Sequence, residues 1–196
     1  VIAVTGSTGK TSVKELIKSI LGGLGSVHAT KGNFNNHIGV PLTLLDMPQD
    51  SDFAVIEMGA SAASEIGYLC SIAKPQISLI NNVQSAHLEG FGSVKGIAAA
   101  KGEIYSGLDS AGTAILNLDQ SWEAEWMALI GDRECITFSV DDDCADISAS
   151  DIQLLENGCC RFTLHIFTDT SVESQVVNLA IPGRHSVSNA LAAAAC

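Results

Sequence analysis

The segment Thr5-Gly-Ser-Thr-Gly-Lys-Thr11 carries the residue types that bind a phosphate chain. Its glycines let backbone N–H groups turn toward an anion, and the first turn of a helix adds partial positive charge at the same point. Lys10 is placed to reach the outer phosphates, and the Thr11 hydroxyl can ligate magnesium. The expected phosphate contacts come from consecutive residues: Gly6, Ser7, Thr8, Gly9, Lys10 and Thr11.

This loop departs from the general Walker A pattern, which has a glycine at the position that Val4 occupies. An ordinary glycine turn that caps a helix is the alternative interpretation. The apolar run Val1–Val4 precedes the loop, and a helix is expected from about Lys10. Strand, turn, lysine, hydroxyl and helix therefore occur in the order that phosphate binding requires, which favours a phosphate loop.

A carboxylate follows another apolar run, because Glu57 comes directly after Phe53–Ile56. The carboxyl ends of parallel strands form the edge at which open α/β sheets bind ligands. Magnesium prefers hard oxygen ligands. A surface glutamate in a turn is the alternative, but placement at a strand end favours a metal ligand.

Two other residues are weak candidates for a catalytic or metal-binding role when each is taken alone. His87 follows the expected strand Ile77–Ile80, but a lone loop histidine usually faces solvent or makes a hydrogen bond. Lys101 lies in the helical segment Gly96–Tyr105, where a lysine normally packs its stem and extends its ammonium to water. We expect the remaining histidines, the tryptophan pair spaced i, i+4 and the methionines to be structural: His28, His37, His165, Trp122, Trp126, Met47, Met58 and Met127.

The elements that position these residues predict an α/β protein with a mostly parallel, doubly wound sheet flanked by helices. Apolar strands alternate with helical stretches, the strands at Phe53–Ile56, Ile77–Ile80 and Thr113–Leu116, and the helices around 65–73, 93–108 and 121–130. Alternating segments then predict antiparallel strands added to the sheet, at 145–155, 160–167 and 175–179. Pro182-Gly183 ends this run, and a helix begins at His185 or Ser186.

Composition restricts the class of function. A formal net charge of −12 opposes binding of nucleic acid over most of the surface, so a nucleotide must be held by a local site. The six cysteines show no zinc-ligand spacing and are expected to be reduced, as in a cytoplasmic protein. No segment suggests membrane insertion. The chain opens on a strand and stops inside an alanine-rich helix, which predicts that residues 1–196 are an excised domain.

Several separated segments together resemble the Mur ligases, a family related to the folylpolyglutamate synthetases, and within it the members that add D-Ala-D-Ala. The resemblance extends over nearly the whole chain, through Gly6–Thr11, Thr30–Leu45, Glu57–Ala60, Asn81-Asn82, Ala86–Gly92, Ala100–Tyr105 and Pro182–His185. It implies that the chain is the central ATP-binding domain of a three-domain enzyme. It also implies ATP and two magnesium ions as the bound groups.

The resemblance assigns roles to residues that the sequence alone leaves open. It makes Glu57 a magnesium ligand, and His87 and Lys101 participants in a second magnesium site, with Lys101 carbamylated by carbon dioxide. Carbamylation needs the neutral amine, so burial or a neighbouring cation that lowers the pKa of Lys101 would favour it. Lys10, His87 and Lys101 are thus the expected catalytic residues.

Two amides, Asn36 and Asn189, resemble those that recognise adenine in the family, although Asn35 competes with Asn36. The family pattern Gly-Arg-His-Asn has Ser186 at its last position here, which removes one polar group from the expected nucleotide pocket. Asn117 and Asp119 are also candidates for polar contacts with the nucleotide. The alternative for both is capping of the helix around 121–130.

The implied reaction is phosphorylation of the terminal carboxylate of UDP-MurNAc-tripeptide by ATP, followed by attack of the D-Ala-D-Ala amine on the acyl phosphate. This is a step in peptidoglycan precursor synthesis, carried out by a cytoplasmic enzyme that we expect to be a monomer. The alternatives are another Mur-type or folylpolyglutamate-type ligase, or a nucleotide-dependent switch. The Asn-Lys-x-Asp segment typical of guanine-specific switches is absent.

Overall fold

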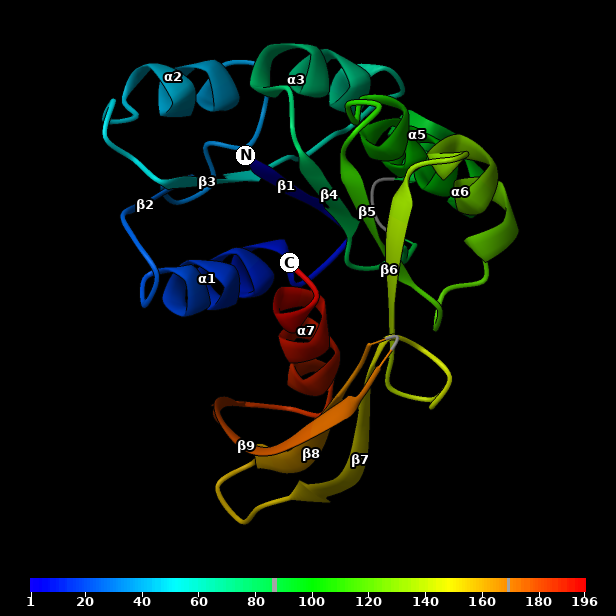
Figure 1. Ribbon diagram of the computed structural model, residues 1–196. Helices are drawn as coiled ribbons and strands as arrows, with labels where there is room; N and C mark the ends of the chain where they lie inside the picture. Colours follow the sequence, from blue (N-terminus) through cyan, green and yellow to red (C-terminus); the bar gives the residue numbers. More distant parts are fainter. Residues whose placement is uncertain (86–87, 169) are drawn as a thin grey trace.

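A computed structural model of the chain describes residues 1–85, 88–168 and 170–196. Figure 1 shows a central sheet with helices on both faces and a strand-rich extension formed by residues 147–182. The helices are α1 (Lys10–Leu21), α2 (Gly39–Leu45), α3 (Glu65–Ala73), α4 (Leu88–Phe91), α5 (Val94–Ser106), α6 (Glu123–Ile130) and α7 (His185–Ala194). The strands are β1 (Ile2–Thr5), β2 (Val27–Ala29), β3 (Phe53–Glu57), β4 (Ile77–Ile80), β5 (Thr113–Asn117), β6 (Glu134–Ser139), β7 (Ile147–Leu154), β8 (Cys159–Phe167) and β9 (Val172–Pro182).

The sheet has the order β2-β3-β1-β4-β5-β6-β7-β8-β9. All neighbours from β2 to β7 pair in parallel, whereas β7–β8 and β8–β9 are antiparallel. The expected fold class is therefore confirmed, including the antiparallel addition. Strand β1 lies between β3 and β4, so the chain segments that follow these three strands meet at one edge of the sheet.

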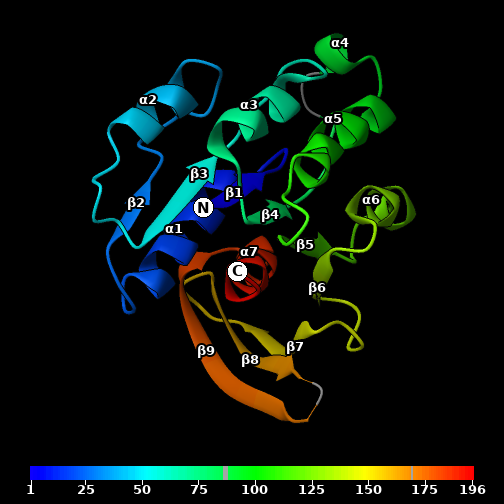
Figure 2. The same cartoon turned by 45° about the horizontal axis from the view of Figure 1, so that its top comes forward.

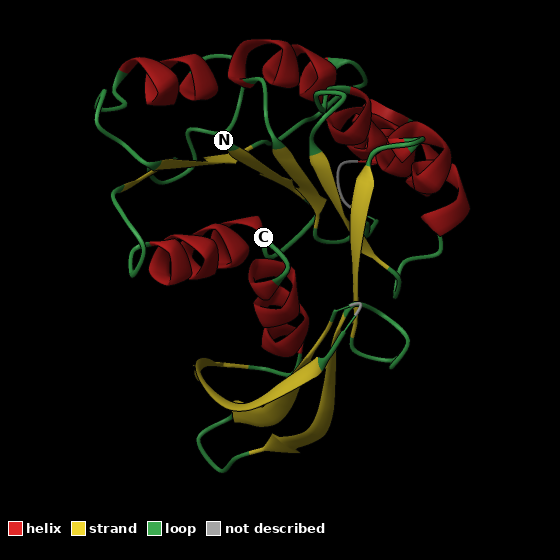
Figure 3. Ribbon diagram, in the orientation of Figure 1, coloured by secondary structure: helices red, strands yellow, loops and turns green. Residues whose placement is uncertain are grey.

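Both faces of the parallel strands are buried, which is why these strands have continuous apolar sequences. One core cluster lies between the sheet and the helices α2, α3, α5 and α6, and a second lies on the face covered by α1 and α7. Figure 3 shows the two groups of helices on opposite sides of the strands. The phosphate-loop helix α1 is thus fixed by packing along its inner side.

Helix α7 connects the parallel sheet to the strand extension. It packs against α1, and the last strands, β7–β9, curve around its other side, as Figure 2 shows. Its buried side chains include Val187 and Leu191, which join the same core cluster as Phe162 of β8. Residues on α7 are therefore held in a defined position relative to the phosphate loop.

Some elements were not expected from the sequence. Strand β2 has three residues and β6 begins on Glu134, so neither forms a continuous apolar run. Helix α2 carries Pro41 in its first turn, where the missing N–H leaves no intrahelical bond unmade. The expectation that Met127 packs in the core is wrong, because it lies on the outer side of α6 and is 42% exposed. Trp126 does pack, donating from Nε1 to the Ala98 carbonyl at 3.2 Å.

The buried side of α1 can be tested with two isoleucines on the same helix. Ile17 is 1% exposed and Ile20 is 51% exposed. Ile17→Ala should lower the free energy of unfolding by about 2 to 4 kcal/mol, because it leaves a cavity against the sheet. Ile20→Ala should change it by less than about 1 kcal/mol. Urea unfolding followed by circular dichroism measures both values, and equal losses would contradict this packing of α1.

Candidate functional site

The loop between β1 and α1 has the backbone form of a phosphate-binding turn. Gly9 adopts φ 75°, a left-handed conformation that favours glycine, and helix α1 begins at the next residue. A Cβ atom at Gly9 would also lie 2.6 Å from Asn81 Nδ2. Asn82 supports the loop from the end of β4, since its Oδ1 accepts from Thr8 N at 2.9 Å and its carbonyl from Ser7 N at 2.9 Å. The conformation of Gly9 and the contacts of Asn82 therefore both stabilise this turn.

Lys10 folds back over the loop, where its Nζ donates to the Gly6 carbonyl at 2.9 Å. Burial lowers the pKa of Lys10, and the carboxylate of Glu57 acts in the opposite direction. An anion bound at the loop would favour the charged ammonium further. The amine therefore lies over the turn, close to the place where a phosphate would bind.

Thr11 and Glu57 lie together, as their spacing from the ends of β1 and β3 predicts. The Thr11 hydroxyl donates to Glu57 Oε2 at 2.9 Å, and Asn35 Nδ2 donates to Oε1 at 2.8 Å. Glu57 is buried, and its partners in the described part of the chain are neutral groups. A hydroxyl and a buried carboxylate at hydrogen-bonding distance are a suitable donor pair for magnesium. The residues present therefore fit this ion.

Lys101 is buried in α5, with only 5% of its surface exposed. Burial lowers the pKa of Lys101 to about 8, and the nearby charge of Lys10 acts in the same direction. A larger fraction of this amine than of an ordinary lysine is therefore neutral near physiological pH, and the neutral amine is the state that reacts with carbon dioxide. His87, the other expected member of the second metal site, lies outside the described residues.

Two cavities open beside the phosphate loop. The first, about 580 Å³, is called the lysine cavity here because Lys10 and Lys101 line it, together with Asn35, Asn36 and residues 59–61. The second, about 570 Å³, is called the amide cavity and is lined by Thr8, Gly9, Asn82, Asn117, Asp119, His185 and Asn189, among others. The loop contributes residues to both cavities, so it forms part of the wall of each.

The two amides that the sequence suggests for adenine recognition, Asn36 and Asn189, line different cavities. Asn189 lines the amide cavity, whereas Asn36 lines the lysine cavity. The side chain of Asn36 accepts from Gly39 N at 2.9 Å and from Ile38 N at 3.1 Å, so it stabilises the start of α2. The side chain of Asn35, the competing candidate, contacts Glu57.

Other residues also lie where the sequence alone did not place them. His37, expected to be structural, lines the lysine cavity. Asn117 and Asp119 line the amide cavity and do not cap α6: Asn117 Nδ2 donates to the Asn81 carbonyl, and Asp119 Oδ2 accepts from Val140 N. Ser186 is buried and donates to the Pro182 carbonyl, so the position where the family pattern has asparagine has a structural contact.

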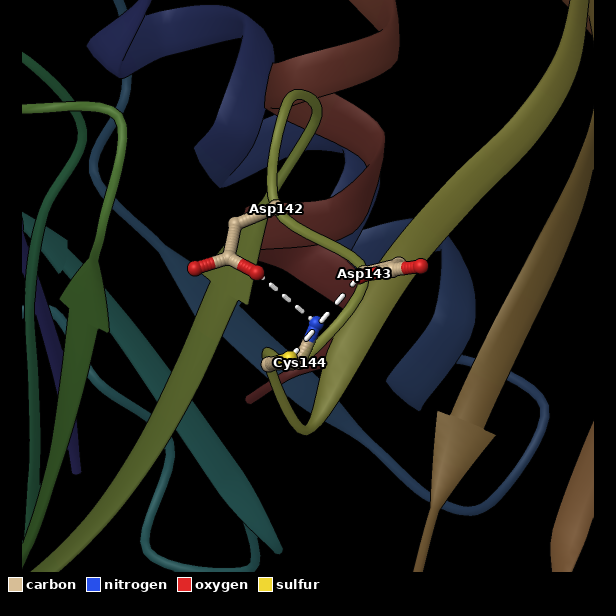
Figure 4. Close-up of side chains that lie close together, drawn as sticks. All are labelled: Asp142, Asp143 and Cys144. Carbon is tan, nitrogen blue, oxygen red and sulfur yellow. Dashed lines mark hydrogen bonds between the residues drawn. The ribbon is translucent and has the colours of Figure 1, made fainter.

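A third group of potential ligands is the exposed acidic loop Asp142-Asp143-Cys144 (Figure 4). Asp142 Oδ1 accepts from Cys144 N at 2.9 Å, which closes a tight turn. The neighbouring carboxylates, Asp142 first, raise the pKa of the Cys144 thiol, which disfavours the thiolate that metals bind. The loop is best described as a solvated turn.

Comparison with known proteins identifies the family. Residues 4–196 match the model of the Mur ligase middle domain. The chain belongs to this family.

The curated relatives of this Mur ligase domain include two bacterial enzymes named UDP-N-acetylmuramoyl-tripeptide–D-alanyl-D-alanine ligase. The protein from Escherichia coli (strain K12) is 47% identical over 195 residues, covering 100% of this chain and 42% of the relative. The protein from Bacillus subtilis (strain 168) is 40% identical over 196 residues, covering 100% of this chain and 40% of the relative. The chain thus spans well under half of the length of these relatives.

Solved structures of MurF ligases share the fold. One from Acinetobacter baumannii has a TM-score of 0.91 at 38% identity, covering 99% of this chain and 41% of that protein. MurF from Thermotoga maritima, solved in complex with ADP, has a TM-score of 0.82 at 29% identity, covering 98% of this chain and 43% of that protein. Within the described part of this Mur ligase domain, every helix is too short or too polar to span a bilayer.

Because the amine of Lys101 is buried, we expect the free energy of unfolding to depend on pH. The pKa of about 8 in the folded chain lies below the unfolded value, so the unfolded state binds more protons between about pH 8 and pH 10.5. Stability should therefore rise with pH across this window. Lys101→Met removes the cost of the buried charge and should raise the free energy of unfolding at pH 7 by roughly 1 to 3 kcal/mol.

Urea unfolding at pH 7 and at pH 10.5, in buffer free of carbon dioxide, measures this effect. The gain from Lys101→Met should shrink toward zero at the higher pH. Lys95→Met, on the exposed side of the same helix, is the matched control and should have little effect at either pH. A gain from Lys101→Met that does not depend on pH would contradict the assigned cause.

Proposed function

We propose that residues 1–196 form the central, ATP-binding domain of a longer ligase that adds D-Ala-D-Ala to UDP-MurNAc-tripeptide. One observation supports the chemistry most directly. The Thr11 hydroxyl and the Glu57 carboxylate lie 2.9 Å apart at the end of the phosphate loop, and the neighbouring cavity is lined by both Lys10 and Lys101. This arrangement suits transfer of a phosphoryl group between two anions.

The two cavities suggest how the substrates are divided. The amide cavity would hold the adenosine of ATP, and its polar groups include Asn117, Asp119 and Asn189. The loop N–H groups would hold the phosphate chain and direct its terminal phosphate toward the lysine cavity. The carboxylate to be activated would then lie in the lysine cavity, beside Lys10 and Lys101. This assignment agrees with the geometry, because the phosphate loop lines both cavities and a bound phosphate chain could extend from one to the other.

The proposed reaction joins the two substrates in the name of the Escherichia coli relative. The terminal carboxylate oxygen of the tripeptide attacks the terminal phosphorus of ATP, forming an acyl phosphate and ADP. The amine of D-Ala-D-Ala then attacks the acyl carbon, loses a proton and expels phosphate, which leaves a new amide bond. In this scheme the protein mainly positions the reactants and stabilises charge.

Charged groups of the chain have distinct parts in this scheme. Lys10 would neutralise the phosphate being transferred, while Thr11 and Glu57 would hold one magnesium ion. Magnesium, when bound, would supply charge neutralisation on the phosphate oxygens. His87 and a carbamylated Lys101 would hold the second ion, a role supported for Lys101 by its buried amine. We propose that the whole enzyme is monomeric and cytoplasmic.

A substrate panel on the full-length protein tests the proposal against its alternatives. Phosphate release from ATP should require both UDP-MurNAc-tripeptide and D-Ala-D-Ala. L-Ala, D-Glu, a diamino acid, or folate with glutamate should not replace them, and GTP should not replace ATP. Phosphate release that is independent of any acceptor would instead indicate a nucleotide switch.

Lys10 provides the sharpest test by mutation. Lys10→Ala in the full-length protein should reduce kcat by at least about 10²-fold, because an electrostatic partner of the transferring phosphoryl group is lost. Lys18→Ala, at the exposed end of the same helix, should leave turnover unchanged. Initial rates of phosphate release measure both. Turnover near the wild-type rate in the Lys10 variant would contradict the assignment of the loop.

A further inference from the structure

Asn81 occupies an unusual position, because it is buried between the phosphate loop and helix α7 and contacts both. It follows β4, and its Nδ2 donates to the Thr8 carbonyl at 3.0 Å and to Asn189 Oδ1 at 2.9 Å. An amide nitrogen carries two protons, so both donors of Asn81 are used. The mechanism described above gives this residue no part.

The other side-chain atom of Asn81 makes no hydrogen bond. Among the described residues, Asn81 Oδ1 is one of two buried side-chain polar atoms without a partner, the other being Ser78 Oγ. A buried acceptor without a partner is costly. An apolar side chain would avoid this cost but could not bridge Thr8 and Asn189. The two N–H donors are therefore the feature of Asn81 that the structure uses.

The orientation of both amides follows from a group that cannot change its polarity. The Thr8 carbonyl only accepts hydrogen bonds, so Asn81 must turn its Nδ2 toward the loop. The second proton of Nδ2 then faces Asn189, which must present Oδ1. Reversing either amide would place acceptor against acceptor or donor against donor. The backbone of the phosphate loop therefore determines how Asn189 is oriented.

Asn189 Oδ1 accepts from Asn81, which turns Asn189 Nδ2 to the opposite side of the amide. In the part of the chain that the structure describes, this nitrogen has no hydrogen-bond acceptor, yet it is not among the buried atoms without a partner. Asn189 lines the amide cavity. Asn189 Nδ2 is thus a hydrogen-bond donor available to a ligand in this cavity, and it suits an acceptor such as a purine ring nitrogen.

We propose that Asn81 is a positioning residue that fixes Asn189 with its Nδ2 donor facing the nucleobase. This inference rests on the proposed function, since it takes the amide cavity as the site of the base. It also couples the loop to base recognition, because Gly9 packs against the same pair: a Cβ there would lie 2.6 Å from Asn81 Nδ2 and 2.8 Å from Asn189 Oδ1. Asn81 itself would not contact the nucleotide.

A double-mutant cycle on ATP affinity tests the inference in the full-length protein, with isothermal titration calorimetry in the presence of magnesium. Asn81→Ala and Asn189→Ala should each raise the Kd for ATP by about tenfold, the value expected for a lost hydrogen bond. If Asn81 acts through Asn189, the double variant should bind ATP more tightly than the product of the two single effects predicts. Additive effects would overturn the inference.

Asn81→Asp is a second variant that keeps the size of the side chain. At neutral pH its carboxylate would face two acceptors, so ATP affinity should fall by at least as much as in Asn81→Ala. Affinity should recover in part as the pH is lowered, because a protonated carboxyl can again donate one hydrogen bond. Asn81→Ala has no group to protonate and should show no such recovery, and unchanged affinity of Asn81→Asp at neutral pH would overturn the inference.

Ser78→Ala is the matched control, because it removes the other unpartnered buried polar atom from the same part of the sheet. Its Kd for ATP should equal the wild-type value, and a loss as large as that of Asn81→Ala would overturn the inference. A wild-type protein that does not bind ATP at all would overturn the proposed function, and this inference with it. Binding by the wild type with additive variant effects would overturn the inference alone.

Discussion

The placement of β1 between two parallel neighbours is the constraint on which the site depends. Because β3 and β4 flank β1 in register, the segments that follow all three strands meet at one edge. That edge brings Glu57 from β3 to the Thr11 hydroxyl and brings Asn81 and Asn82 from β4 to the loop. A loop of this sequence on an edge strand would lack half of these contacts. The chemistry of the site therefore follows from sheet order as much as from the loop itself.

The electrostatics of the site contrast with those of the whole chain. The chain carries a formal net charge of −12, yet the lysine cavity is lined by two lysines whose pKa values are lowered mainly by burial. Placing two ammonium groups close together in a buried site costs free energy unless an anion binds beside them. Glu57 offsets part of this cost for Lys10. A bound phosphate chain would offset more, so the same burial that destabilises the charged lysines strengthens their attraction to it.

The sequence predicted the parts of the site that depend on local order. The loop, the position of Glu57 at a strand end and the bounds of helix α3 each follow from a short stretch of residues. It did not show that Asn36 stabilises the start of α2, because the glycine and proline in that segment made the helix hard to recognise. The bond between Asn81 and Asn189 joins residues 108 positions apart and leaves no local pattern. His37 was missed for the same reason, since only the folded chain brings it to the lysine cavity.

The separation of the two cavities means that the sites proposed for the nucleotide and for the acyl substrate can vary independently. The amide cavity is built from the ends of β4 and β5 and from α7, whereas the lysine cavity is built from the segments after β2 and β3 and from α5. The elements that would recognise adenosine are thus different from those that would face the acyl group. Substitutions around residues 35–37 and 59–68 can alter the lysine cavity while leaving the amide cavity unchanged. Nucleotide use can therefore stay constant while specificity for the acyl substrate diverges, with the phosphate loop as the part common to both cavities.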